Sequence, residues 1–396
     1  MNFSLYSFFS VVIAIFSMYF GAGNLIYPLI VGRDSGVLLP IGFIGFLISG
    51  VLIPLAGLVA MVLFDGDYVS FFQRLGKNVG NLLIFFCILI LGPVIVMPRI
   101  ITLSHIMIAP MFGGSMFGSI NYCSSLCFAI LFLTITFFAT YKESKIVDIL
   151  GIVVGPLLLI TLIIIIVKGI FTQSHDVITP LASRVAVFLK SFLLGYGTLD
   201  LLASLFFSSA IGTLLQKSYP SISTKERIWY VVVCGSLGVL MLAIVYLGLS
   251  IIGMLHGAAL RDAGGGDLFR DLALNVLGHG GSFVVGVSVC MACISTAIAI
   301  VVVVAEYIEQ VIFAHKLSYF YCLLITLVSC IPLSIIGLDQ VLSIAAGPIL
   351  YVGYPVLIML TFCNILYKTI QFRPVKLPVG CVFVISTILY VVIMWL

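Results

Sequence analysis

The stretch Phe20-Gly21-Ala22-Gly23-Asn24 interrupts the first hydrophobic run of the chain. That run covers 5–31 without a charged residue, which is long enough to cross a bilayer. Glycine is a poor helix former and proline lacks a backbone donor, so the two glycines and the following Pro28 predict a helix break. A break inside lipid leaves N–H and C=O groups unpaired, at several kcal/mol each, unless a polar partner is held there. Close helix packing through small residues is the alternative explanation.

Composition places the chain among polytopic helical membrane proteins. Of its 396 residues, 63% are hydrophobic and 8% are charged, whereas soluble proteins carry about 25% charged residues. The apolar runs are continuous rather than alternating, which excludes a β-barrel. The ten cysteines are scattered through apolar runs and are expected to be buried hydrophobes, not metal ligands or disulfides. Neither nucleic-acid binding nor soluble enzyme chemistry is expected.

Ten more hydrophobic runs follow, which predicts eleven spans in one transmembrane domain, 1–396. They cover 37–63, 82–109, 119–139, 146–168, 187–214, 229–254, 282–304, 318–336, 340–366 and 378–395. Cytoplasmic loops of membrane proteins are rich in Lys and Arg. With the N-terminus in the cytoplasm, eleven such residues fall in cytoplasmic loops and six in external loops. We therefore expect a multi-pass protein of the cytoplasmic (inner) membrane with the N-terminus inside. Eleven spans would place the C-terminus outside, and a twelfth span is the alternative.

The sixth run carries a second interruption, Gly195-Tyr196-Gly197-Thr198-Leu199-Asp200. The fifth and tenth runs are also marked alike, by Gly155-Pro156 and Gly347-Pro348. Matching features five spans apart predict two repeats, about 5–168 and 187–366, followed by an additional span at 378–395. Because five is odd, the repeats are inverted relative to each other. Two interrupted spans at corresponding places indicate the central site of a secondary transporter.

Two charged residues lie well inside predicted spans, away from the span ends, and both are candidates for coupling or gating. Asp200 follows the second interruption, and ionised residues inside a membrane are costly and usually functional. It is expected to hold a cation, to take part in proton or gate coupling, or to order the break itself. A purely structural acid is the alternative. Arg99 follows Pro98 in the third span and is a candidate to attract a substrate carboxylate, form a gate, or pair with Asp200 or Asp339. A purely structural arginine is the alternative, and direct substrate contact is not assigned.

Ligands for a small cation are predicted in the eighth span, where Ser295 and Thr296 place adjacent hydroxyls. Hard cations prefer several oxygen ligands, which these hydroxyls and the freed carbonyls of span one supply. Hydroxyls that merely bond their own helix are the alternative. The half-helices favour a zwitterionic substrate, with its carboxylate at the N–H groups of span one and its ammonium at a carbonyl end of span six. Tyr196 and Phe20 are candidates for the wall of this pocket, and simple packing is their alternative role.

At these residues the chain resembles the branched-chain amino acid:cation symporter family, of BrnQ type. The matches are 21–28 (Gly-Ala-Gly-Asn-Leu-Ile-Tyr-Pro), Gly92-Pro93 with Met97-Pro98-Arg99, Gly195-Tyr196 with Thr198 and Asp200, 292–298 (Ala-Cys-Ile-Ser-Thr-Ala-Ile), and Ala305-Glu306-Tyr307. The resemblance covers nearly the whole chain in order. The chain departs from the family pattern at Leu29, where a second proline is usual, and at Ser295, where threonine is usual. It also departs in its eleven spans, because twelve are usual.

The resemblance implies an all-α polytopic membrane protein with a LeuT-like inverted five-plus-five helix repeat, in which helices 1 and 6 are broken. It also implies uptake of leucine, isoleucine and valine driven by Na⁺, or by H⁺ in some relatives. The residues that would hold the amino acid are Gly21, Ala22, Gly23, Asn24, Gly195, Tyr196, Gly197 and Thr198. Those that would hold Na⁺ are Phe20, through its carbonyl, Ser295 and Thr296.

The leading expectation is therefore a secondary active transporter working by alternating access, with Na⁺ as the coupling ion and no other cofactor. Its partners would be an amino-acid substrate and the lipid bilayer, and the sequence sets no oligomeric state. An H⁺-coupled carrier, or a carrier of another small apolar or aromatic amino acid, is the alternative. A membrane enzyme would need a nucleophile with a base or a metal cluster, and a channel would need polar rings along a pore. The sequence favours neither of these two classes.

Overall fold

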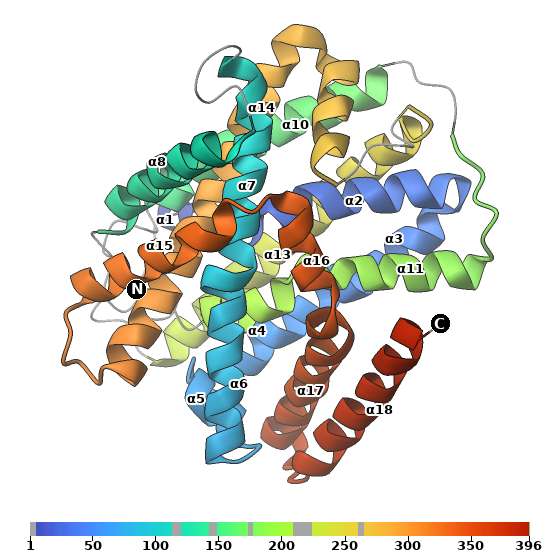
Figure 1. Ribbon diagram of the computed structural model, residues 1–396. Coiled ribbons are helices and arrows are strands. Elements are labelled where there is room, and N and C mark those ends of the chain that lie inside the picture. Colours follow the sequence, from blue (N-terminus) through green and yellow to red (C-terminus); the bar gives the residue numbers. More distant parts are fainter. Residues whose placement is uncertain are drawn as a thin grey trace.

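In the computed structural model, every regular element of the described residues is a helix (Figure 1). The structure describes residues 5–112, 120–141, 149–172, 177–208, 224–259 and 265–395. Its helices are α1 (Leu5–Tyr19), α2 (Ala22–Ser35), α3 (Leu39–Leu47), α4 (Ile53–Leu63), α5 (Tyr68–Gln73), α6 (Lys77–Leu89), α7 (Val96–Ile108), α8 (Tyr122–Thr140), α10 (Gly155–Phe171), α11 (Arg184–Tyr196), α13 (Thr224–Leu255), α14 (Gly265–Tyr307), α15 (Tyr319–Ser334), α16 (Leu338–Ala346), α17 (Tyr354–Ile370) and α18 (Lys376–Trp395). A further helical segment covers 200–208.

The helices account for the predicted hydrophobic runs. Eight helical stretches of the described residues are long and apolar enough to cross a membrane, and Ala22–Leu63 combines the second half of span one with span two. Shorter apolar helices cover the rest: Phe8–Tyr19, Tyr319–Ser334 and Lys376–Val392. The predicted eighth span, 282–304, is part of the longer α14. Of the basic residues used for the orientation, Lys142, Lys145, Lys217 and Arg261 lie outside the described residues.

Prolines make several spans irregular. Pro54, Pro156 and Pro355 lie in the first turns of α4, α10 and α17, and each follows a π-helical turn of the same span. Proline lacks a backbone donor and its ring clashes with the carbonyl four residues earlier, and the wider turn relieves both problems. In span three, Pro93 lies inside such a turn, where Gly92 leaves helical geometry (φ −82°, ψ −109°).

The first and sixth spans are each broken into two helices, as the sequence predicted. α1 ends at Tyr19 and α2 begins at Ala22, while α11 ends at Tyr196 and the segment 200–208 follows. Leu199, between the halves of span six, has a left-handed backbone (φ +62°), which L-residues adopt rarely. Both breaks are buried, because Phe20 is 0% exposed and Leu199 is 2% exposed.

Neighbouring helices enclose the two breaks. α13 packs along α1 and α2, α11 packs along α3, and α14 packs against α7, α10 and α2. α2 and α11 also contact each other, and they run side by side at the right of Figure 1. The breaks therefore meet spans three, seven and eight in the interior of the protein, and this is where the polar side chains converge.

Candidate functional site

The first break is bridged to α14 by two hydroxyl groups. Ser295 Oγ donates to the carbonyl of Ser17 at 2.7 Å, and Thr296 Oγ1 donates to the carbonyl of Met18 at 3.1 Å. Ser295 Oγ also lies 2.9 Å from the carbonyl of Ala292 in its own helix. The last carbonyls of a helix have no partner within it, so the end of α1 needs donors from elsewhere. The two hydroxyls supply them.

Gly21 allows this close approach. Its backbone is extended (φ −105°, ψ −166°), and a Cβ atom added there would lie 3.1 Å from Thr296 Oγ1. Glycine thus both ends the run of helical geometry and lets the hydroxyls of α14 reach the end of α1. The result is a cluster of hydroxyl and carbonyl oxygens at the negative end of a helix dipole. Such a cluster is the kind of environment that a hard cation prefers.

The second break is filled by Arg99, from α7. Its Nη1 donates to the carbonyl of Gly197 at 2.7 Å, and its Nη2 lies 3.4 Å from the carbonyl of Thr198. The guanidinium also lies against α2, because a Cβ atom on Gly23 would be 3.1 Å from Nη2. Arg99 is 2% exposed, and no described side chain forms an ion pair with it. The expected pairing with Asp200 is therefore absent, and the side chain of Asp339 lies outside the described residues.

Asp200 instead joins the two breaks to span seven. The amide Nδ2 of Asn24, in α2, lies 3.0 Å from each carboxylate oxygen of Asp200 and 2.9 Å from the carbonyl of Tyr19. The hydroxyl of Tyr246, in α13, donates to Asp200 Oδ2 at 2.9 Å and also contacts the Asn24 amide. Three different spans thus share one buried carboxylate. Of the three roles expected for Asp200, this geometry favours that of ordering the breaks.

These polar groups surround a small central cavity. Its volume is about 20 Å³, which is enough for about one water molecule. Polar lining comes from Asn24, Arg99, Thr198, Asp200 and Thr296, and apolar walls come from residues that include Met18, Val96, Ile100 and Ile300. An amino acid would not fit in this volume, so the conformation is a closed one.

The structure brings part of the predicted substrate set to this cavity. Gly21, Ala22, Asn24 and Thr198 line it together with Arg99, Asp200 and Thr296. The other predicted residues lie beside it. A Cβ atom on Gly195 would meet Ser49 Oγ at 2.0 Å, and one on Gly197 would meet the ring of Tyr27 at 2.3 Å. These two glycines therefore permit close helix packing, although the carbonyl of Gly197 faces Arg99.

The two predicted aromatic wall residues do not line the cavity. Tyr196 packs with its ring centroid 4.8 Å from that of Tyr354. Phe20 stacks on Phe16 at 5.4 Å and lies 6.4 Å from the ring of Tyr246. The hydroxyls of α14 reach the carbonyls of Ser17 and Met18, which the sequence analysis had not singled out.

Tyr246 is the main residue that the sequence analysis missed. Its hydroxyl completes the hydrogen bonding of Asp200, yet it is one of 17 tyrosines in the chain. The sequence feature that could have identified Tyr246 is its position in an otherwise aliphatic part of span seven, 242–249. A buried tyrosine hydroxyl needs a partner, and an acid in a neighbouring broken span is a natural one.

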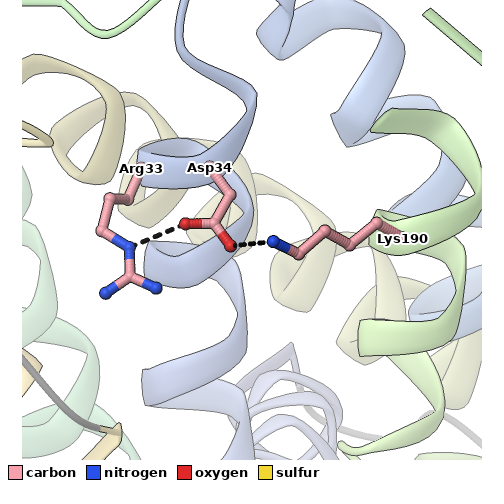
Figure 2. A network of polar contacts seen from close by, with 3 residues as sticks. All are labelled: Arg33, Asp34 and Lys190. Atoms are coloured by element: carbon pink, nitrogen blue, oxygen red, sulfur yellow. Dashed lines mark hydrogen bonds and ion pairs between the residues drawn. The ribbon is translucent and has the colours of Figure 1, made fainter. Parts of the chain in front are cut away.

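A second charged cluster ties α2 to α11 nearer the surface. Figure 2 shows Asp34 between Arg33 and Lys190. Arg33 Nε lies 2.8 Å from Asp34 Oδ1, and Lys190 Nζ lies 2.9 Å from Asp34 Oδ2. The Lys190 side chain is 64% exposed, so the pair is well screened by water. It links two half-helices that flank the cavity.

Comparison with known proteins agrees with this arrangement. A family described as "Branched-chain amino acid transport protein" matches residues 5–394. The branched-chain amino acid permease BraB of Bacillus subtilis is 30% identical over 364 residues, which are 89% of this chain and 79% of the permease. Among solved structures, MhsT in complex with L-phenylalanine has a TM-score of 0.63 at 16% identity and covers 98% of this chain and 97% of that one.

A second solved structure, a manganese transporter of Eremococcus coleocola, has a TM-score of 0.55 at 14% identity and covers 98% of this chain and 85% of that one. At such identities the two structures bear on the fold alone, and both are consistent with the LeuT fold that the two broken spans predict. The relatives are carriers and permeases, so the protein is a transporter and not an enzyme. The match over nearly the whole chain shows that this multi-pass membrane protein belongs to the branched-chain amino acid transport family.

Proposed function

We propose that this protein imports leucine, isoleucine and valine together with Na⁺, by alternating access around the central cavity. It would lie in the cytoplasmic membrane with its N-terminus inside, which the distribution of Lys and Arg supports. The closed cavity of about 20 Å³ would have to expand to admit the substrate. Movement of one helix group relative to the rest is the usual way in which a broken-helix site opens to alternate sides.

Sodium coupling is supported by the hydrogen bonds of Ser295 and Thr296 to carbonyls at the end of α1. A hydroxyl oxygen donates one hydrogen bond and still has lone pairs to offer. Rotation of the two hydroxyls would direct their oxygens to a cation, next to the carbonyls of Ser17 and Met18. Four neutral oxygens in a dry site suit Na⁺, because the helix dipole favours positive charge at this end.

The substrate assignment rests on three features of the cavity. The N–H groups at the start of α2 suit a carboxylate, and the carbonyls at the end of α11 suit an ammonium. Met18, Ile100 and Ile300 supply apolar walls suited to a branched side chain. The choice among apolar amino acids depends on pocket size, and one methylene changes the discrimination by about 1–3 kcal/mol.

Uptake of labelled isoleucine by proteoliposomes would test the proposal. The purified protein should accumulate isoleucine against a gradient when Na⁺ is imposed inward, and saturate with substrate. Ser295→Ala combined with Thr296→Ala should abolish accumulation driven by Na⁺, because two of the four proposed ligands are lost. A matched control is Thr326→Ala combined with Ser329→Ala, since those hydroxyls bond carbonyls of α15 alone among the described residues.

The alternatives make distinct predictions in the same assay. Accumulation driven by an imposed pH gradient, and indifferent to Na⁺, would replace sodium by protons and direct attention to the buried carboxylate of Asp200. Accumulation of another apolar or aromatic amino acid, with isoleucine as a poor competitor, would keep the ion site and change the substrate. Equal losses in the α14 and α15 double variants would contradict the sodium site.

A further inference from the structure

The carbonyl end of α11 is occupied by a cation that belongs to the protein itself. Under the proposed function, the carbonyls of Gly197 and Thr198 would receive the substrate ammonium. In the structure they receive the guanidinium of Arg99, at 2.7 and 3.4 Å. The inference drawn here rests on that proposed function.

Arg99 is not held as a permanent structural arginine usually is. A buried arginine normally has a carboxylate partner and satisfied donors, because its charge is costly inside a membrane. Among the described residues, Arg99 has no ion pair, and its Nε is buried without a hydrogen-bond partner. Its hydrogen bonds go to the two carbonyls, and Gly23 leaves room for the guanidinium. Asp200 lines the same small cavity but forms no ion pair with it, so the hydrogen bonds of Arg99 come from the carbonyls of the second break.

We propose that Arg99 occupies the ammonium subsite of the substrate-free transporter and is displaced when the amino acid binds. In the substrate-free protein the guanidinium donates hydrogen bonds to the carbonyls of Gly197 and Thr198, which would otherwise lack a donor inside the membrane. The substrate ammonium replaces it at the same carbonyls. Because both groups carry one positive charge, the break is satisfied with and without substrate.

This arrangement would let the transporter close and reorient without substrate, which is the return step of the transport cycle. Net uptake requires the protein to reorient without substrate, whereas exchange of internal for external amino acid requires reorientation only with substrate bound. Without Arg99, the closed empty state loses its cation and becomes unfavourable. The substrate-bound state is unaffected at these carbonyls. Arg99 is thus predicted to serve the return step and to compete with the substrate.

The test compares binding, net uptake and exchange of labelled isoleucine in wild type and Arg99→Ala. Removal of the competing guanidinium removes hydrogen bonds from a charged donor, so isoleucine should bind about tenfold more tightly. Exchange into proteoliposomes loaded with isoleucine should persist, while net uptake into empty proteoliposomes should fall by about tenfold or more. A merely structural arginine would not produce tighter binding together with selective loss of net uptake.

Two further variants complete the test. Thr102→Val is the matched control, because that hydroxyl in α7 bonds carbonyls of its own helix, and it should leave all three readouts near wild type. If Arg99→Ala does not fold, Arg99→Lys serves instead, since lysine keeps the charge but lacks the planar fork. It should shift binding and the ratio of net uptake to exchange in the same directions, by smaller factors.

The opposite results would overturn the proposal. Weaker isoleucine binding, with equal losses of exchange and net uptake, would mean that Arg99 binds substrate directly or only supports the fold. Unchanged net uptake in a folded Arg99→Ala protein would exclude a role in the return step. Failure of the wild type to bind any branched-chain amino acid would instead overturn the proposed function, and with it the role assigned to Arg99.

Discussion

The two helix breaks meet one requirement with different chemistry. Each leaves carbonyl groups at the end of a helix inside the membrane, where every such group needs a donor. At the end of α1 the donors are the neutral hydroxyls of Ser295 and Thr296. At the end of α11 the donor is the charged guanidinium of Arg99.

This difference separates two kinds of binding. A hydroxyl both donates and accepts, so it can turn from a carbonyl to a cation without leaving its place. A guanidinium has donors alone, and it must leave before another cation can reach the same carbonyls. The first break is therefore suited to adding an ion, whereas the second is suited to exchanging one cation for another. On this ground we propose that Na⁺ binds at the first break and the substrate ammonium at the second.

The largest expected effect comes from Asp200→Asn, which would disrupt the hydrogen bonds that join the two helix breaks. The carboxylate accepts from Asn24 and Tyr246, and an amide in its place would set an NH₂ group against one of these donors. Removal of one partner from a buried charged network costs about 3 kcal/mol or more. We expect a corresponding loss in the free energy of unfolding, measured by denaturation in detergent, and no ion-driven uptake of isoleucine.

The control for this variant is Asp67→Asn. Asp67 caps α5 at the surface by accepting from the amide of Ser70, and asparagine caps helices equally well. Its stability and uptake should stay near wild type. Near-normal, ion-driven uptake by the Asp200→Asn protein would contradict the view that one carboxylate holds the two breaks together.

Sequence reasoning located the breaks because their signal is local. Glycines and a proline in an apolar run, or an acid such as Asp200 within a span, stand out against their neighbours. The partners at each break carry no such signal. The carbonyls of Ser17 and Met18 belong to ordinary helical residues, and only the packing of α14 on α1 selects them. Arg99 was found as a charge in lipid, but its carbonyl partners were not.

Glycine has two structural roles in this chain that the sequence alone does not distinguish. Gly21 lies at a break and faces the hydroxyl of Thr296, while Gly195 lets α11 pack closely on span two at Ser49. Both uses depend on the missing side chain, so both look the same in the chain. Tyr196 was a candidate for the pocket wall because it lies between two glycines of the second break, and in the structure it packs on Tyr354 instead of lining the small cavity.

An intermediate effect is expected from adding one methyl group on either side of Ala22. In Gly21→Ala the new Cβ would press on Thr296, and in Gly23→Ala it would press on Arg99, each at 3.1 Å. Overpacking of this kind costs about 1 kcal/mol, or about fivefold in an affinity. Gly21→Ala should raise the Na⁺ concentration for half-maximal uptake. Gly23→Ala should leave that value unchanged and tighten isoleucine binding.

The pair of glycine variants sharpens the comparison because the two glycines lie two residues apart, Gly21 at the N-cap of α2 and Gly23 in its first turn. Each variant serves as the control for the other, and both should fold alike. The measurements are Na⁺ titration of uptake and direct binding of isoleucine to the purified proteins. A similar rise in the Na⁺ requirement for both variants would show that the two breaks are not chemically separate.

The smallest effect is expected at the outer ion pair, in a double-mutant cycle of Asp34→Asn and Lys190→Gln. The pair joins α2 to α11, but Lys190 is largely exposed, and pairs of this kind contribute about 0.5 kcal/mol or less. The coupling energy from denaturation should be of that size, with Na⁺ titration and isoleucine binding unchanged. A larger coupling, with both affinities shifted together, would mean that the position of α2 against α11 sets both sites. The hydroxyls at one break and the guanidinium at the other would then respond to a single movement, and their different chemistry would not make them independent.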